Sequence, residues 1–170
     1  MKEAFTHKSL LILGRGIGQV MFQNNALSGL LMLIGIFLNS WQMGLLAVSG
    51  NIISTSTGRI SGYDRDDIKN GLYGFNGTLV GIAAGVFMHL TVNSLILMAI
   101  ASCASTYIAR FFNMQRMLPG FTTLFILSVW MLLGLCSWLM PDMLLVSDTE
   151  TPASSSINYL QCFSMSIGQV

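Results

Sequence analysis

Charge is what this sequence has least of. Only 9% of its 170 residues are charged, 53% are hydrophobic, and the mean hydropathy is +0.67. Roughly a quarter of the residues in a soluble domain are charged, so this chain lacks the groups to cover a water-facing surface. Residues 16–58, 70–109 and 117–141 contain no Asp, Glu, Lys or Arg. Uncharged stretches of this length suit a bilayer core about 30 Å thick, and the sequence therefore predicts a polytopic membrane protein.

Further absences exclude classes of function. A net charge of +1 gives no concentrated basic face for nucleic acid. Cys103, Cys136 and Cys162 form no CxxC pair, and His7 and His89 stand alone, so we expect no metal and no cofactor. No HExxH, GxSxG or Walker motif occurs, which argues against an enzyme. Without a carboxylate in the apolar stretches, a proton- or ion-coupled pump is also disfavoured.

Five apolar segments are predicted to form membrane-spanning helices, so the expected fold class is all-α. They cover residues 26–38, 41–57, 72–88, 92–109 and 121–140. Asn24–Asn25 is expected to cap the first segment, while Asn39–Ser40 and His89–Thr91 form tight turns. In the polar loop before the third segment, Asp64 or Asp66 is predicted to cap a helix running into Leu72.

The basic residues all fall on one side of this layout. With alternating spans, that side receives Lys2, Lys8, Arg15, Arg59, Arg65, Lys69, Arg110 and Arg116. The opposite side receives only Asp142, Asp148 and Glu150. The positive-inside rule then predicts a multi-pass protein of the plasma or inner membrane with a cytoplasmic N-terminus.

A short phrase occurs twice. GIGQV at residues 16–20 returns as SIGQV at residues 166–170, with four matches in five positions. Such a match arises by chance in membrane segments rich in Gly, Ile and Val, or it marks a repeat. Because an odd number of spans separates the two copies, a repeat would have inverted topology, as in many transporters.

The stretch at residues 10–23 is too short to cross the bilayer in addition to the five spans. Gln19 and Phe22 are spaced i, i+3, on one face of a predicted helix. Two interpretations stay open: a half-spanning helix that lines a polar passage, or an interfacial helix anchored by Phe22.

Two further stretches combine small, aromatic and polar residues. In GLYGFNGTLVGIAAG (residues 71–85), glycines at every fourth position predict close helix packing. Phe75 and Leu79 share one helical face, and the amide of Asn76 either satisfies backbone at a helix break or faces a polar passage. In MLPGFTTLF (residues 117–125), the Thr122 hydroxyl either turns into such a passage or bonds back to its own helix.

Three of these stretches together resemble the urea transporter family. They are RGIGQVMFQNNALSGLL, GLYGFNGTLVGIAAG and LPGFTTLF, and the resemblance extends over residues 10–170. The third is similar to the family's LPxxTxPF signature, although Leu124 stands where the signature has proline.

The resemblance implies an architecture and a site. Family members have two inverted halves, each with five spanning helices and one half-spanning helix, and they assemble as trimers with a urea pore in every protomer. In the pore, aromatic and aliphatic side chains sandwich the planar solute while oxygen atoms accept its N–H groups. By motif position, Gln19 and Phe22 match the half-helix amide and aromatic residue, Phe75 and Leu79 match the slot walls, and Thr122 matches a hydroxyl of the oxygen ladder.

The expected function is facilitated, uncoupled transport of urea. Residues 1–160 would form the first half-repeat and residues 161–170 the start of a second, so we expect a partial or truncated member that needs a complementary half-repeat. Its partners would be urea, the lipid bilayer and further copies in a homotrimer, with no nucleic acid. The alternatives are a non-transporting membrane remnant or assembly subunit, and a channel for another small amide or for ammonia.

Overall fold

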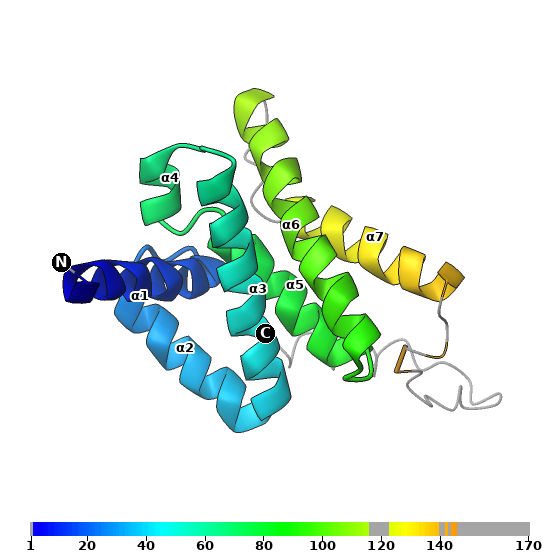
Figure 1. Cartoon of the computed structure of the whole chain (residues 1–170). Helices are drawn as coiled ribbons and strands as arrows, with labels where there is room; N and C mark the ends of the chain where they lie inside the picture. Colours follow the sequence, from blue (N-terminus) through cyan, green and yellow to red (C-terminus); the bar gives the residue numbers. More distant parts are fainter. Residues whose placement is uncertain (1, 116–122, 140–141, 143, 146–170) are drawn as a thin grey trace, which may run out of the picture.

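The computed structural model describes residues 2–115, 123–139, 142, 144 and 145. These residues form helices joined by short turns, without a β-strand among them (Figure 1). In chain order the elements are α1 (Lys2–Gly18), the 3₁₀ turn η1 (Gln19–Met21), α2 (Ala26–Asn39), α3 (Trp41–Ile60), α4 (Arg65–Lys69), α5 (Gly74–Phe87), α6 (Val92–Gln115) and α7 (Thr123–Leu139). The predicted all-α class is confirmed.

Capping side chains end the helices where the sequence predicted turns. The Oδ1 atom of Asn25 accepts a hydrogen bond from Leu27 N at 2.9 Å and starts α2. Ser40 ends α2 and, by accepting from Met43 N at 3.3 Å, also starts α3. The predicted first turn is therefore confirmed, and α2 and α3 follow each other with one residue between them.

Two local predictions are wrong. The first helix begins at Lys2, not near residue 10, and ends at Gly18, after which the chain turns back toward α2. Asp64 does cap a helix, by accepting from Asp66 N at 2.8 Å, but that helix is the short α4 and does not run into Leu72. Gly71, with φ of +77°, interrupts the chain before α5 begins, because this conformation is accessible to glycine at no steric cost.

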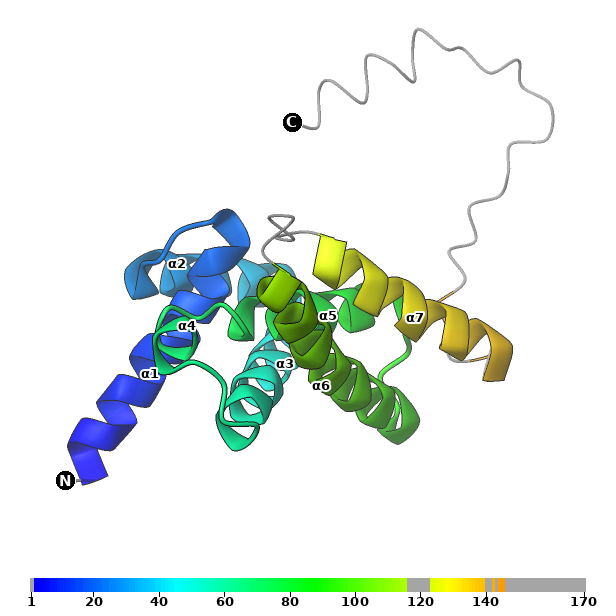
Figure 2. The same ribbon diagram turned by 90° about the horizontal axis from the view of Figure 1, so that it is seen from above.

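The pair formed by α3 and α5 lies in the middle of the structure. The helices α1 and α2 lie on one side of it and α6 and α7 on the other (Figure 1, and from above in Figure 2). Contacts between α3 and α5 are the most extensive between any two elements of the described residues. The helices on both sides of the fold therefore pack against this central pair.

Glycines let the α3 and α5 backbones touch. A Cβ atom placed on Gly77 would meet the carbonyl oxygen of Gly50, and one placed on Gly50 would meet the carbonyl oxygen of Gly77. One turn further along α5, a Cβ on Gly81 would collide with the carbonyl of Leu46. The predicted packing role of the glycines in the 71–85 stretch is therefore confirmed.

The described part of the chain has an apolar exterior and a polar interior. Leu38 and Trp138 are 83% and 82% exposed, whereas Asn51, Thr78 and Ser105 are completely buried. Polar groups inside and large apolar groups outside are the arrangement that lipid surroundings favour. The fold thus agrees with the membrane character predicted from the composition.

The number of membrane spans stays a prediction. Among the described helices, Val92–Phe112 is long and apolar enough to cross a bilayer by itself. Ser9–Met21 and Ala26–Asn39 meet the same test only when joined, and they are bent by 74° at the break between them. The apolar helix α5 has 14 residues and at 1.5 Å per residue rises only about 21 Å.

Candidate functional site

Gln19 lies where the end of α1 meets the loop between α4 and α5. Its Nε2 atom donates to the carbonyl oxygen of Asn70 at 3.1 Å, and the side chain is half-buried. Asn24 Nδ2 donates to Asn70 Oδ1 at 3.0 Å, and Arg15 donates to the carbonyl of Lys69 at 3.2 Å. Within the described residues, Gln19 Oε1 accepts no hydrogen bond, so this oxygen is available to an N–H donor.

Phe22 follows η1 in an unusual backbone conformation. Its φ and ψ are 55° and 25°, in the left-handed region, and its N–H donates to Gln19 O at 2.8 Å. A bulky residue with positive φ is a genuine outlier, and here it turns the chain toward α2. Gln19 and Phe22 therefore do not share one face of a regular α-helix as predicted, and the Phe22 side chain is 65% exposed.

Phe75 and Leu79 lie on α5, the helix against which η1 packs. Phe75 N donates to Gly71 O at 3.1 Å and closes the turn that starts α5. The Phe75 side chain is 7% exposed and that of Leu79 is half-buried. The structure thus brings the element with Gln19 next to the helix that carries both predicted slot walls, whereas Thr122 lies outside the described residues.

A buried polar network between α1, α3 and α5 was missed by the sequence analysis. Asn51 Nδ2 donates to Leu13 O of α1 at 3.2 Å and to Thr78 Oγ1 of α5 at 2.9 Å. Its Oδ1 accepts from Thr55 Oγ1 at 3.2 Å, and Thr78 Oγ1 donates to Gly74 O at 3.0 Å. The available signal was an amide in the middle of an otherwise apolar segment, since such an amide needs partners.

A second set of buried hydroxyls joins α3 to α6 and to the start of α5. Ser54 Oγ donates to Tyr73 O at 2.8 Å and lies 2.6 Å from Thr106 Oγ1. The Thr106 hydroxyl is also within hydrogen-bond distance of Ser54 O, at 3.2 Å. These contacts fix the residue that immediately precedes α5, and so they help to position Phe75.

Asn76 is a buried amide next to Phe75. The side chain is completely buried, and neither Nδ2 nor Oδ1 has a hydrogen-bond partner among the described residues. Each unsatisfied buried group costs about 1–3 kcal/mol. Asn76 therefore does not satisfy the backbone at the break before α5, and it retains unused hydrogen-bonding capacity beside a predicted slot wall.

An open pocket lies between η1 and α2. Its volume is about 280 Å³ and it is lined by Gly18, Met21, Gln23, Ser28, Leu31 and Met32. Inside it, Ser28 Oγ donates to Gln23 Oε1 at 3.1 Å. None of the predicted solute-contacting residues lines this pocket, so we place the candidate site on the α5 side of η1, where Gln19 and Phe75 are carried.

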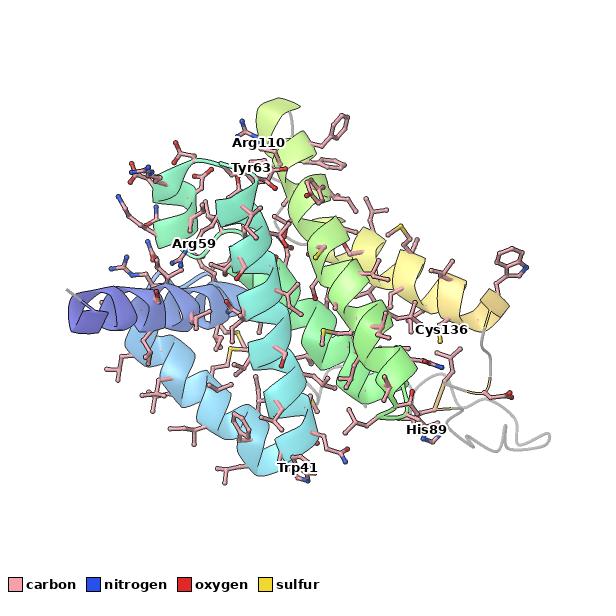
Figure 3. The ribbon with its side chains drawn as sticks, in the orientation of Figure 1. Trp41, Arg59, Tyr63, His89, Arg110 and Cys136 are labelled. Atoms are coloured by element: carbon pink, nitrogen blue, oxygen red, sulfur yellow. The ribbon has the colours of Figure 1, made fainter. Side chains whose placement is uncertain are left out.

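Charged and aromatic residues gather at one end of the central helices. Figure 3 shows Arg59, Tyr63 and Arg110 toward this end and Trp41 and His89 toward the other. The Arg110 guanidinium lies 5.3 Å from the centre of the Tyr63 ring, a cation–π contact. This distribution of the described residues agrees with the one-sided basic charge noted in the sequence.

The adjoining α4 loop carries the acidic residues of this end. Backbone hydrogen bonds from Asp67 and Asp66 hold the pKa of the Asp64 carboxyl below its usual value, because they stabilise the ionised form. Among the described residues no group of three His, Cys, Asp or Glu side chains is placed to hold a metal ion.

Comparison with known proteins identifies the family. The family model described as "Urea transporter" matches residues 10–170. "Urea transporter 1" of Mus musculus is 41% identical over 75 residues, which cover 44% of this chain and 20% of the relative. The proteins of the same name in Rattus norvegicus and Ovis aries are 42% and 40% identical over 73 residues, 43% of this chain and 19% of each relative. The matched part thus spans about a fifth of the length of these curated relatives.

Proposed function

The chain belongs to the urea transporter family, a family of integral membrane proteins, and we propose that it contributes to facilitated, uncoupled passage of urea across a membrane. The observation that carries this proposal is the contact between η1 and α5. It brings Gln19 Oε1, an amide oxygen without a hydrogen-bond partner among the described residues, to the helix that bears Phe75 and Leu79. Oxygen acceptors and aromatic faces are what a small, planar, neutral molecule with N–H groups requires.

Each proposed site residue has one task. Phe22, Phe75 and Leu79 stack against the planar solute, and Gln19 and Thr122 accept hydrogen bonds from its N–H groups. The Phe22 side chain is 65% exposed, and this supports its role because a slot wall must present an aromatic face to the solute. Absence of charge from residues 16–58 and 70–109 favours passive transport, since a coupled pump needs a titratable group at depth.

The proposed architecture has five spans and one half-spanning segment, the latter formed by the end of α1 with η1. This unit is one half of an inverted repeat, and a complementary half-repeat closes the slot over Phe22. The assembly is a homotrimer in the plasma or inner membrane with the N-terminus on the cytoplasmic side. The one-sided placement of Arg59 and Arg110 supports this orientation.

Stopped-flow light scattering on proteoliposomes tests the proposal. Vesicles that contain the chain together with a complementary half-repeat are mixed with a urea gradient, and the rate of volume recovery is compared with that of protein-free vesicles. Gln19→Leu is expected to lower the urea flux about tenfold, the effect of one hydrogen bond worth about 1.4 kcal/mol. Gln42→Leu is the matched control, because Gln42 is exposed at the start of α3 and is not a proposed solute-contacting residue.

The same assay separates the alternatives. Thr122→Val is expected to lower urea flux while the neighbouring Thr123→Val leaves it unchanged. If these vesicles recover no faster than protein-free vesicles although both parts are folded, the proposed contribution to urea transport is refuted and an assembly subunit is favoured. Faster flux of formamide, thiourea or ammonia than of urea would instead assign a different solute.

A further inference from the structure

We propose that Asn51 is the positioning residue that sets the distance between the two halves of the candidate site. This inference rests on the proposed function. Asn51 lies in the middle of α3, and its side chain is completely buried. Among the described residues its hydrogen bonds reach Leu13, Thr55 and Thr78 rather than a predicted solute-contacting residue, so it acts through the two segments that carry those residues.

The amide of Asn51 bridges those two segments. Nδ2 donates to Leu13 O, one turn and a half before η1, and to Thr78 Oγ1, the residue directly before Leu79. One donor group thus binds the segment that leads to Gln19 and the helix that carries Phe75 and Leu79. A change in the amide changes both contacts at once.

Glycines in both segments are matched to this amide. A Cβ on Gly16 would lie 2.7 Å from Asn51 Nδ2, and a Cβ on Gly74 would lie 2.6 Å from Asn51 Oδ1. Both phrases that the sequence analysis singled out therefore approach the same side chain. Because both backbones pack closely against this amide, we infer that its position fixes the position of α1 relative to α5.

The hydrogen bonds also fix which way the amide faces. Oδ1 accepts from Thr55 Oγ1, one turn further along α3, so Nδ2 is directed toward α1 and α5. Thr78 passes the connection on to the backbone at Gly74, directly before Phe75. An apolar side chain of the same size fills the space but supplies none of these bonds, so it packs without setting the spacing.

The test compares Asn51→Leu with Thr57→Val. Thr57 lies on the same helix, and its hydroxyl donates to Ile53 O of that helix and contacts Cys103. The first readout is backbone hydrogen exchange by mass spectrometry in nanodiscs. Asn51→Leu is expected to speed exchange in residues 10–24 at least about tenfold, from the loss of two hydrogen bonds, with Thr57→Val at the wild-type rate.

The second readout is the ratio of urea flux to N-methylurea flux in proteoliposomes. This ratio does not depend on how much folded protein each vesicle holds, so a purely structural loss leaves it unchanged. A slot whose walls are wrongly spaced admits the wider solute, and the ratio is expected to fall about fivefold or more in Asn51→Leu. If that variant does not fold, Thr78→Val, which removes only the α5 side of the bridge, is expected to lower the ratio in the same direction.

Each outcome decides the proposal. Unchanged exchange in residues 10–24, or an increase spread evenly over all helices, would overturn the positioning role. A normal flux ratio in folded Asn51→Leu or Thr78→Val would also overturn it. Wild-type vesicles without urea flux in the presence of the complementary half-repeat would refute the proposed function instead, while the exchange arm still decides whether Asn51 holds the two segments together.

Discussion

Replacing Gly77 by alanine is expected to separate the two central helices. In the structure, a Cβ at this position meets the carbonyl oxygen of Gly50 and lies 2.5 Å from the Cβ of Ser54. Neither neighbour is the far end of a flexible side chain, so relief requires movement of the backbone. Overpacking of this kind costs about 1–3 kcal/mol, and contact with a carbonyl oxygen puts this site at the upper end of that range.

The helix propensity of alanine offsets part of this cost. Alanine is about 1 kcal/mol better than glycine inside a helix, which leaves a net destabilisation of about 2 kcal/mol for Gly77→Ala. Gly35 on α2 is the matched control, because a Cβ there has nothing within 4 Å. Gly35→Ala should therefore be neutral or stabilising by up to about 1 kcal/mol, and the two variants should differ by about 3 kcal/mol.

Unfolding in detergent micelles with increasing SDS measures both variants, with tryptophan fluorescence as the signal. The midpoint should fall for Gly77→Ala and stay or rise for Gly35→Ala. Equal midpoints for the two variants would show that α3 and α5 are not in backbone contact at Gly50 and Gly77. In that case the close packing that carries both flanks of the fold would have to be rejected.

Two further predictions concern polar groups. Ser54→Ala removes the hydroxyl that joins Tyr73 O to Thr106 and should lower the free energy of unfolding by about 1–3 kcal/mol in the same SDS titration; an unchanged midpoint would contradict the network. Because the pKa of Asp64 is lowered in the fold, the stability that its capping bonds contribute is fully present above pH 3.8, the ordinary pKa of an aspartate, and is lost as the pH falls through the lower folded pKa. The side-chain carboxyl ¹³C shift of Asp64 should therefore titrate with a midpoint below 3.8, and a midpoint at or above that value would contradict the capping bonds.

The apolar pattern predicted most of the helices. Where their boundaries were also predicted, the reason is that a local capping side chain sets them. Asn25 and Ser40 cap α2 and α3 with their own side chains, and both were visible as turn residues. The bounds of the first helix were misplaced because its ends carry no capping residue that the sequence analysis could recognise. Its end at Gly18 is imposed by neighbours: a Cβ there would lie 2.6 Å from Asn25 O and 2.7 Å from Gln23 O.

The candidate site was only partly accessible to sequence reasoning. Spacing suggested that Gln19 and Phe22 share a helical face, but the left-handed backbone of Phe22 depends on the return of the chain into α2. Asn51 was overlooked because a hydropathy pattern registers it only as one polar residue within a predicted span. Its partners Leu13 and Thr78 are distant in sequence. Such long-range hydrogen bonds leave no periodic signal.

The bond between Gln19 and Asn70 also constrains how the protein is made. Its partners are 51 residues apart, and Gln19 leaves the ribosome first. At ~5–20 residues per second, ~3–10 s pass before Asn70 has been synthesised. Throughout that interval the end of α1 has neither Asn70 nor Thr78 near it, so the segment that comes first in the chain reaches its final place only after α5 has been translated.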